Sequence, residues 1–268
     1  KQITSMVGYP LRFNKSMKYF KDALMEERIG KIIFVRSRSS SYLPDWRPDT
    51  DYRDSVSAQK KLGGGVLLEV SHEVDYLHWI FGESRIYSSY IGKLSDLEVD
   101  TEDYAFLLMG FAEKESNSFK AELSLDFFSK SVCRECEVIG ESGRLIWDGV
   151  NNTVRHFDYK LGQSNHVYRG SSSDINEMYL SEIKYFIDCI NNNQADVKSI
   201  SEARKTLEII MDANNISRRV KAKRKMKDKD GLIVFSKKGD TPRFVFMEKD
   251  EKVKNIDHIA AFKIFEAN

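Results

Sequence analysis

The stretch GGGVLLEVSHEVDYLHWIFG, residues 63–82, decides how the rest of the chain is interpreted. Three consecutive glycines interrupt any regular element and let the backbone come close to another group. Gly82 lies at the end of the stretch, where a helix is commonly capped by a residue with a left-handed backbone conformation. Between the glycines, apolar residues recur at steps of one, three or four, which predicts a single helix with one buried face. That face carries Val66, Leu67, Val70, Val74, Leu77 and Phe81.

A second, polar row lies beside this apolar face. It consists of Glu69, His72, Asp75 and Tyr76. Residues three or four apart are neighbours on a helix, so the row would share one edge of the buried face. A carboxylate beside an imidazole orients the ring and holds its pKa near neutrality, which suits general acid/base chemistry. A structural histidine on an amphipathic helix fits the same spacing, and the residues alone leave both interpretations open.

Extended to Glu83, the stretch resembles the signature helix of the glucose–fructose oxidoreductase/inositol dehydrogenase (Gfo/Idh/MocA) family of nicotinamide-dependent sugar oxidoreductases. Two further segments resemble the same family: YPLRF at 9–13, and the segment from DYR (51–53) through KL (61–62). The similarity extends over residues 1–217.

The resemblance implies roles for three residues of the polar row. His72 matches the histidine that works beside a catalytic lysine. Glu69 stands in the place of the acidic residue, although it lies three residues before His72 and is Glu rather than the commoner Asp. Asp75 is expected to support the edge of the helix.

The part of the family that binds the nucleotide has no counterpart in the chain. A Rossmann unit needs a glycine-rich turn, because only glycine lets backbone N–H groups close on the pyrophosphate. The chain contains no G-x-G-x-x-G motif and no Glu-Lys-Pro segment, which carries the catalytic lysine in the family. The resemblance therefore implies that the chain corresponds only to the catalytic and oligomerisation half of the family's proteins. Residues 1–9 would be the last strand of the missing nucleotide-binding domain. Lys1 is not an initiator methionine, so we expect residues before it or a trimmed start.

A long polar loop, residues 42–59, follows a β-rich run at 32–40. Loops of this length inside a compact domain are commonly functional. Trp46 and Arg47 place a planar apolar face beside a fixed cation, which suits a ring and a phosphate. A tryptophan packed into a surface loop is the alternative.

The resemblance assigns two sets of contacts in this region. Contacts to NAD or NADP are implied for Arg12, Trp46 and Arg47. Contacts to the sugar substrate are implied for Tyr52 and Arg53.

The remaining pattern predicts an α+β fold. Runs rich in β-branched and aromatic residues, several of them separated by turn formers, are typical of antiparallel strands. They lie at 86–91, 104–111, 118–127, 132–139, 143–147 and 153–159. Helices are expected from Asn14, as N-cap, to about residue 30, and at 176–190 and 201–218. We therefore expect a large, mostly antiparallel sheet with helices on one face, like the C-terminal domain of these oxidoreductases.

The uncovered face of such a sheet predicts contact between chains. It would expose alternating residues such as Phe106, Leu108, Leu123, Leu125 and Phe127, whichever set points outward. Contiguous apolar surface marks an interface, and symmetric homodimers are the commonest way to bury one. We therefore expect a homo-oligomer that pairs through the sheet.

Composition argues against several other classes of protein. A net charge of +1 over 268 residues gives no general attraction to nucleic acid or membranes. No apolar run approaches the roughly 18 residues of a spanning helix and no signal peptide opens the chain, so we expect no membrane contact and a cytoplasmic protein. Three cysteines make no disulfide framework, and the C-x-x-C at 133–136 lies in a strand, where residues three apart face opposite ways. We predict no metal site.

The composition changes after Asn215. Eight lysines and arginines crowd into residues 218–229, which is typical of a solvated linker, placed here at 218–230. The run does not favour a nucleic-acid contact, because no aromatic residues are interleaved with the cations. Residues 232–236 and 243–247 predict a hairpin and 256–267 a short helix, so 231–268 would form a small extension without family resemblance.

Two functional hypotheses of different classes follow. The first is the C-terminal part of an NAD(P)-dependent oxidoreductase acting on a carbohydrate or nucleotide sugar, as in surface-sugar biosynthesis. The second is a non-catalytic module for oligomerisation or carbohydrate binding that lacks the cofactor. His72 distinguishes them, because only the first hypothesis requires its proton chemistry.

Overall fold

The computed structural model describes residues 4–112, 118–171, 173–192, 197–227, 231–238 and 241–248. The chain divides into two units, Lys1–Ile216 and Ser217–Asn268, and the sheet with its core lies in the first. None of the helices in the described part of the chain has the length and apolar character needed to span a membrane.

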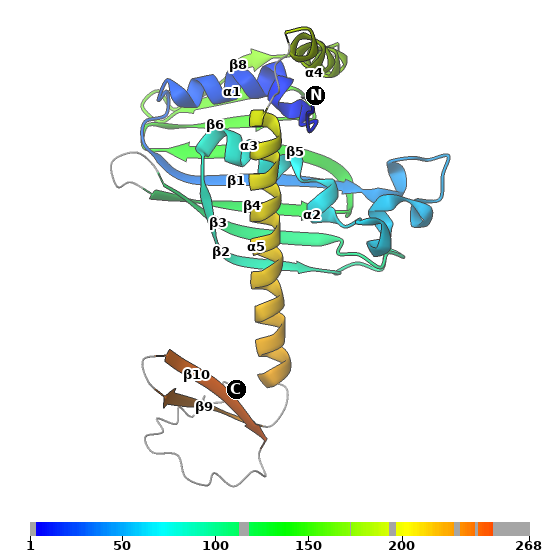
Figure 1. Cartoon of the computed structure of the whole chain (residues 1–268). Helices are drawn as coiled ribbons and strands as arrows, with labels where there is room; N and C mark the ends of the chain where they lie inside the picture. The colour runs from blue at the N-terminus through cyan, green and yellow to red at the C-terminus, as the bar shows by residue number, and fades with distance from the viewer. Residues whose placement is uncertain are drawn as a thin grey trace. The chain divides into compact units, whose positions relative to one another are not determined.

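The first unit is built on one eight-stranded sheet (Figure 1). Its strand order is β2-β3-β4-β1-β5-β6-β7-β8, and every neighbouring pair is antiparallel except β1 and β4. The strands are β1 (Ile32–Tyr42), β2 (Ser84–Gly92), β3 (Tyr104–Ala112), β4 (Ser118–Asp126), β5 (Phe128–Gly140), β6 (Gly143–Asp148), β7 (Thr153–Asp158) and β8 (Gln163–Arg169). The predicted β-rich run and all six predicted strands are thus confirmed, within a residue or a few at their ends. The strand β8 was not predicted, because it lacks an apolar alternation.

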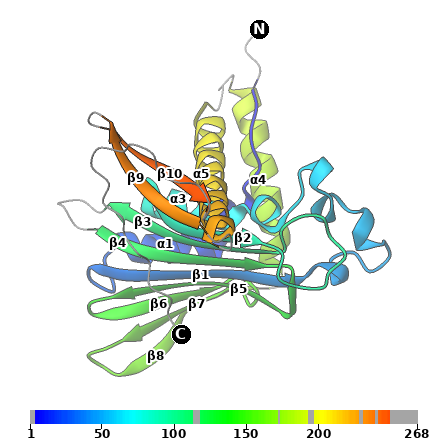
Figure 2. The same ribbon diagram turned by 90° about the horizontal axis from the view of Figure 1, so that it is seen from below.

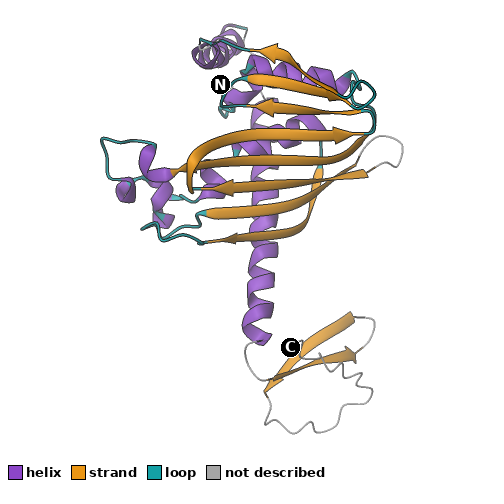
Figure 3. Ribbon diagram, turned by 180° about the vertical axis from the view of Figure 1, so that it is seen from behind, coloured by secondary structure: helices purple, strands orange, loops and turns teal. Residues whose placement is uncertain are grey.

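The helices of this unit cover one face of the sheet and leave the other bare (Figures 1 and 3). The helices on that face are α1 (Lys15–Met25), α2 (Val66–Glu69), α3 (His72–Phe81) and the first part of α5 (Val197–Lys227), whereas α4 (Asp174–Asn191) packs mainly against the 3-10 helix Pro10–Phe13. Figure 2 shows α3 and α5 on the same side of the strands. The predicted α+β fold, with a mostly antiparallel sheet covered on one side, is confirmed.

Alternation along β3 and β4 decides which apolar set faces the helices. Leu123, Leu125 and Phe127 are fully buried, whereas Phe106 and Leu108 lie on the other face and are only partly buried. The bare face also carries charges: Arg36 pairs with Glu122 and Glu137 across β4, β1 and β5. This face is therefore mixed in character rather than uniformly apolar.

The first helix begins where its cap predicts. The Asn14 side chain accepts a hydrogen bond from the Met17 backbone N–H at 2.9 Å, which satisfies one of the unpaired donors of the first turn. Met17, Phe20 and Ala23 are buried beneath it. The helix ends at Met25, earlier than expected.

The prediction of one continuous helix over 63–82 is wrong. The chain forms two helices, α2 and α3, with a turn at Val70 and Ser71. There the Ser71 N–H bonds to the Leu68 carbonyl, three residues back rather than four, and Val70 has left the helical region with ψ at 31°. A β-branched residue followed by serine favours such a break, because valine is stiff at χ1 and serine bonds to nearby backbone.

The flanking glycines adopt positive φ, although Gly82, with ψ of −150°, does not form the left-handed helical cap expected there. Gly63, Gly65 and Gly82 have φ of 83°, 115° and 82°, which L side chains rarely adopt. A Cβ on Gly64 would lie 2.0 Å from the Val56 carbonyl oxygen, so the backbone of the 3-10 turn Val56–Ala58 packs directly on it.

The strand predicted at the start of the chain is not formed in the described residues. Residues 4–9 belong to no strand or helix and take part in no ladder pairing. A strand needs a partner to take its backbone N–H and C=O groups, and the eight strands of the sheet do not include this segment.

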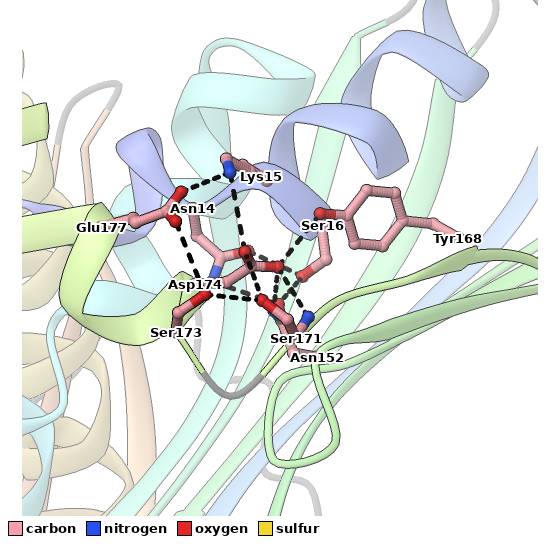
Figure 4. A network of polar contacts seen from close by, with 9 residues as sticks. All are labelled: Asn14, Lys15, Ser16, Asn152, Tyr168, Ser171, Ser173, Asp174 and Glu177. Atoms are coloured by element: carbon pink, nitrogen blue, oxygen red, sulfur yellow. Dashed lines mark hydrogen bonds and ion pairs between the residues drawn. The ribbon is translucent and has the colours of Figure 1, made fainter.

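A polar network joins the start of α1, the β6–β7 turn and the start of α4 (Figure 4). Asn152 is central: its side chain receives a hydrogen bond from Ser16 Oγ at 2.5 Å and donates to Asp174 Oδ2 at 2.9 Å. Burial would raise the pKa of Asp174, but hydrogen bonds from Ser171 hold it below its usual range. The network fixes the beginning of α4 beside the N-terminal segment.

The C-terminal part was predicted in outline. The helix expected at 201–218 is confirmed and runs further, to Lys227, so the basic run lies largely on a helix. The hairpin is confirmed as β9 (Gly231–Lys238) paired with β10 (Thr241–Glu248). The helix expected at 256–267 lies outside the described residues.

Candidate functional site

His72 begins α3 and packs against the N-terminal segment. Its ring stands edge-on to Tyr9, with centroids 5.7 Å apart. Burial lowers the pKa of His72, because it removes water from the imidazolium; Glu73 raises that pKa and Arg134 lowers it. The ring's Nδ1 is buried and meets no hydrogen-bond partner among the described residues. The ring nitrogen therefore keeps an unused capacity for one hydrogen bond.

Tyr9 closes one side of the His72 ring. Burial raises the pKa of Tyr9, while hydrogen bonding with the Ser71 and Thr206 side chains lowers it. The tyrosine therefore connects the start of α3 with α5 and stays a neutral hydrogen-bonding group at pH 7.

Asp75 lies one turn after His72 on α3 and forms an ion pair with Arg12. The Arg12 Nε and Nη2 atoms each donate to one Asp75 oxygen at 2.8 Å, and Thr206 Oγ1 adds a third donor at 3.2 Å. Arg12 also pairs with Glu202 of α5. Burial would lower the pKa of Arg12, but the Asp75 and Glu202 carboxylates raise it. These contacts clamp the short 3-10 helix η1 (Pro10–Phe13) to α3 and α5.

Glu69 ends α2 and is separated from His72 by the helix break. The Ser57 hydroxyl donates to Glu69 Oε2 at 2.7 Å, which ties Glu69 to the preceding loop. Its negative charge is still close enough to raise the pKa of His72. Glu69 therefore acts on His72 through its charge rather than as a member of the same helix edge.

Sequence reasoning missed the ion pair between Glu73 and Arg134. Glu73 is fully buried, and Arg134 of β5 donates to it from Nε at 2.6 Å. Glu73 is the largest cause of the raised pKa of Arg134. Glu73 follows His72 directly in the quoted stretch, but nothing in the sequence pointed to a partner 61 residues away.

The loop residues lie apart from His72 in their contacts. Trp46 is 41% exposed, stands edge-on to Phe127 and donates from Nε1 to Ser41 Oγ at 2.8 Å. Arg47 is exposed. No hydrogen bond or ion pair joins the predicted loop residues to His72 within the described chain.

Tyr52 and Arg53 hold the loop together. The Tyr52 hydroxyl accepts the Glu98 backbone N–H at 3.1 Å, and Arg53 pairs with Asp51 and Glu98. The Asp51 and Glu98 carboxylates raise the pKa of Arg53. The polar groups of Tyr52 and Arg53 are thus bound to other residues of the same chain.

The predicted cofactor contacts differ in how well they suit a nucleotide. The guanidinium of Arg12 is committed to Asp75 and Glu202, so it offers little to a phosphate. The indole of Trp46 and the side chain of Arg47 are exposed, so both remain accessible for contact with another molecule.

The cysteines face different surroundings. Cys136 is fully buried, and burial raises the pKa of its thiol. Cys133 is partly exposed and accepts a hydrogen bond from Arg38 Nε at 3.1 Å. Over the described residues, no group of three or more His, Cys, Asp or Glu side chains is placed to hold a metal ion.

Several solved structures share this fold. Levoglucosan dehydrogenase in complex with NADH superposes with a TM-score of 0.66 at 16% identity, covering 82% of this chain and 65% of that chain. An oxidoreductase from Agrobacterium radiobacter in complex with NAD+, L-tartaric acid and magnesium superposes with a TM-score of 0.62 at 15% identity, covering 81% of this chain and 63% of that chain. UDP-N-acetylglucosamine 3-dehydrogenase from Acidithiobacillus ferrooxidans superposes with a TM-score of 0.55 at 14% identity, covering 80% of this chain and 61% of that chain.

The chain spans 61 to 66% of the length of these and the other solved structures compared. No curated protein sequence matches it. The family description "Oxidoreductase family, C-terminal alpha/beta domain" (Gfo/Idh/MocA) matches residues 21–220. Because this match takes in 200 of the 268 residues, the chain belongs to the Gfo/Idh/MocA oxidoreductase family, as its C-terminal alpha/beta domain.

Proposed function

We propose that the chain is the substrate and catalytic part of an NAD(P)-dependent oxidoreductase that acts on a hydroxyl-bearing carbon of a carbohydrate or nucleotide sugar. The observation that carries this proposal is His72: a neutral, mostly buried imidazole whose Nδ1 has no partner in the described chain, at the position of the family's histidine. A purely structural histidine would be expected to have its buried nitrogen satisfied.

His72 performs the proton chemistry in this proposal. It accepts the hydroxyl proton in the direction of oxidation and returns it in the direction of reduction. The negative charge of Glu69 favours the imidazolium that forms, and the Arg12–Asp75 pair fixes the start of α3. A bound nicotinamide supplies the hydride acceptor or donor. The lysine of the family's Glu-Lys-Pro segment would come from the nucleotide-binding part.

The class of substrate rests on the similar proteins. By their descriptions, one structural neighbour is a levoglucosan dehydrogenase, another a UDP-N-acetylglucosamine 3-dehydrogenase and a third a 3-ketoreductase in complex with TDP-benzene and NADP. A carbohydrate or nucleotide sugar from a surface-sugar pathway is the substrate that we propose for this chain.

The chain alone is expected to bind NADH weakly or not at all. It contains no glycine-rich phosphate turn, and its nucleotide-facing residues suit only a peripheral contact. Isothermal calorimetry of residues 1–268 with NADH should show no saturable heat in the micromolar range. Micromolar binding would show that this chain makes its own nucleotide site.

A non-catalytic module is the second candidate. It is favoured by the loop residues Tyr52 and Arg53, whose polar groups are bound to Glu98 and Asp51 rather than left free for a sugar. Full activity of a His72→Ala variant in a protein that carries the nucleotide-binding part would support this second candidate.

The chain is expected to form a homo-oligomer through the bare face of the sheet. Tyr90, Tyr104 and Phe128 form an aromatic row there. The ring centroids are 6.1 Å apart for Tyr90 and Tyr104 and 6.2 Å apart for Tyr104 and Phe128. Phe106→Arg, on the same face, should therefore dissociate the assembly by placing a charge in the interface. Light scattering would then change from a multiple of 31.0 kDa to the monomer mass.

A matched control is available on α4. Ile183 is 55% exposed on that helix, so Ile183→Arg should leave the oligomer intact if the sheet face is the interface. Dissociation by Ile183→Arg but not by Phe106→Arg would move the interface to α4. A monomer of about 31 kDa for the unsubstituted chain at high micromolar concentration would refute oligomerisation.

A further inference from the structure

The aromatic ring of Tyr9, in the N-terminal segment, is a direct neighbour of the His72 imidazole. The two rings stand at 90° to each other with centroids 5.7 Å apart, the edge-to-face arrangement that aromatic pairs prefer. Nδ1 of His72 is buried and has no hydrogen-bond partner among the described residues. No hydrogen bond at that nitrogen therefore restricts the rotation of the imidazole, whereas the ring of Tyr9 does so by contact.

The hydroxyl group of Tyr9 holds the tyrosine ring at one end. It is hydrogen-bonded with the side chains of Ser71 and Thr206. Ser71 directly precedes His72 at the turn where α3 begins, and Thr206 lies on α5. The tyrosine ring is thus tied to the turn that carries His72 and to a second helix.

Arg12 supports the face of the Tyr9 ring. Its guanidinium carbon lies 5.9 Å from the ring centroid of Tyr9 and 6.0 Å from that of Trp79, both within the range of a cation–π contact. The guanidinium is itself fixed, because Nε and Nη2 each donate to one oxygen of the buried Asp75 at 2.8 Å. Since Asp75 is on α3, these contacts lead from His72 through Tyr9 and Arg12 back to the same helix.

We propose that Tyr9 is a positioning residue, which holds the His72 imidazole in the orientation that it needs to exchange a proton with the substrate hydroxyl. The catalytic consequence rests on the proposed function of His72, but the orientation itself is a property of the folded chain. A reacting group has to be held within about 0.5 Å and 10–20° of its productive geometry. An imidazole that turned freely would meet that requirement only part of the time.

Tyr9 is uncharged at pH 7, so its effect on His72 can be separated from that of the neighbouring charges. Burial has the largest influence on the pKa of His72 and lowers it. The charged groups that act on that pKa are Glu69 of α2, Glu73 and Asp75 of α3, and Arg134 of β5. Removal of the Tyr9 ring leaves these charges in place and admits water to the imidazole. The pKa of His72 should then rise toward its ordinary value.

Nuclear magnetic resonance of the imidazole groups in the full chain tests this proposal without a measurement of activity. His72→Asn identifies the signals of His72. In the unsubstituted chain, a nuclear Overhauser effect should connect the ring protons of Tyr9 with those of His72. In Tyr9→Leu the pKa of His72 should rise and its ring signals should move toward an average over several orientations. Tyr9→Phe keeps the ring and should keep the pKa closer to that of the unsubstituted chain.

Tyr159→Leu is the matched control, because Tyr159 is 44% exposed in the turn after β7. It should leave the signals and the pKa of His72 unchanged. Absence of the Overhauser effect between Tyr9 and His72 in the unsubstituted chain would overturn the proposal, and that measurement depends on no variant. An unchanged pKa of His72 in a folded Tyr9→Leu variant would overturn it too, as would an equal rise in Tyr159→Leu.

Kinetics of a form that carries a nucleotide-binding domain tests the catalytic consequence. Tyr9→Leu should lower kcat by about 10 to 100-fold, since a displacement of about 1 Å has an effect of that size. The KM for the nucleotide should stay unchanged, the acid limb of the pH profile for oxidation should move to higher pH, and Tyr9→Phe should retain most of the activity. Unchanged kcat in Tyr9→Leu, where His72→Asn is inactive, would overturn the positioning role. Unchanged kcat in His72→Asn would instead contradict the proposed function, while the resonance result for Tyr9 would stand.

Discussion

His72→Asn is expected to lower kcat by about 10² to 10⁴-fold in a form of the protein that carries a nucleotide-binding domain. Asparagine keeps a polar side chain near the position of Nδ1 but cannot exchange a proton. The KM for the nucleotide should stay close to its original value, because His72 is proposed to act on the substrate hydroxyl. Steady-state kinetics with the sugar and nucleotide varied separately measures both quantities.

The same substitution at His166 provides the control. His166 is exposed on β8, so His166→Asn should change neither kcat nor KM. The unfolding midpoint of His72→Asn should also be recorded, because loss of structure would lower activity for another reason. Unchanged kcat in a folded His72→Asn variant would contradict the proposed acid/base role and favour the non-catalytic module.

Arg134→Met is expected to destabilise the first unit by about 3–5 kcal/mol. It leaves Glu73, which is fully buried, without its ion-pair partner. A buried charge without a partner costs far more than the pair itself contributes, since the carboxylate has lost its water. Chemical denaturation followed by circular dichroism gives the free energy of unfolding.

Two further variants identify the cause of that loss. The double variant Glu73→Gln/Arg134→Met should recover much of the stability, because no unpaired charge remains. Arg204→Met removes an arginine from an exposed pair with Glu208, with side chains 78% and 55% exposed, and should change stability little. Equal losses for Arg134→Met and Arg204→Met would contradict the explanation by burial.

Local patterns in the sequence were sufficient for most of the secondary structure. Runs rich in β-branched and aromatic residues predicted the strands from β2 to β7, and helical spacing with Asn14 as a cap predicted α1. These patterns work because each reports which side of a single element is buried. They also predicted that the helices could cover only one face of the sheet.

The failures occurred where local preference and tertiary contacts act together. The apolar stripe over 63–82 continues through Val70 and Ser71, yet the backbone turns there and separates Glu69 from His72. The N-terminal segment has a strand-like sequence, but residues 4–9 have no strand beside them. A repeating pattern specifies a buried face and not the presence of a hydrogen-bonding partner.

The sequence by itself therefore determined the fold class, the order of most elements and the choice of His72 as the central candidate. Only the tertiary structure decided what surrounds His72. Arg12 binds Asp75 across 63 residues and Arg134 binds Glu73 across 61, pairings that no local spacing encodes. The physical reason is that the folded backbone determines which charged side chains lie within hydrogen-bonding distance, and burial then requires each of them to be paired.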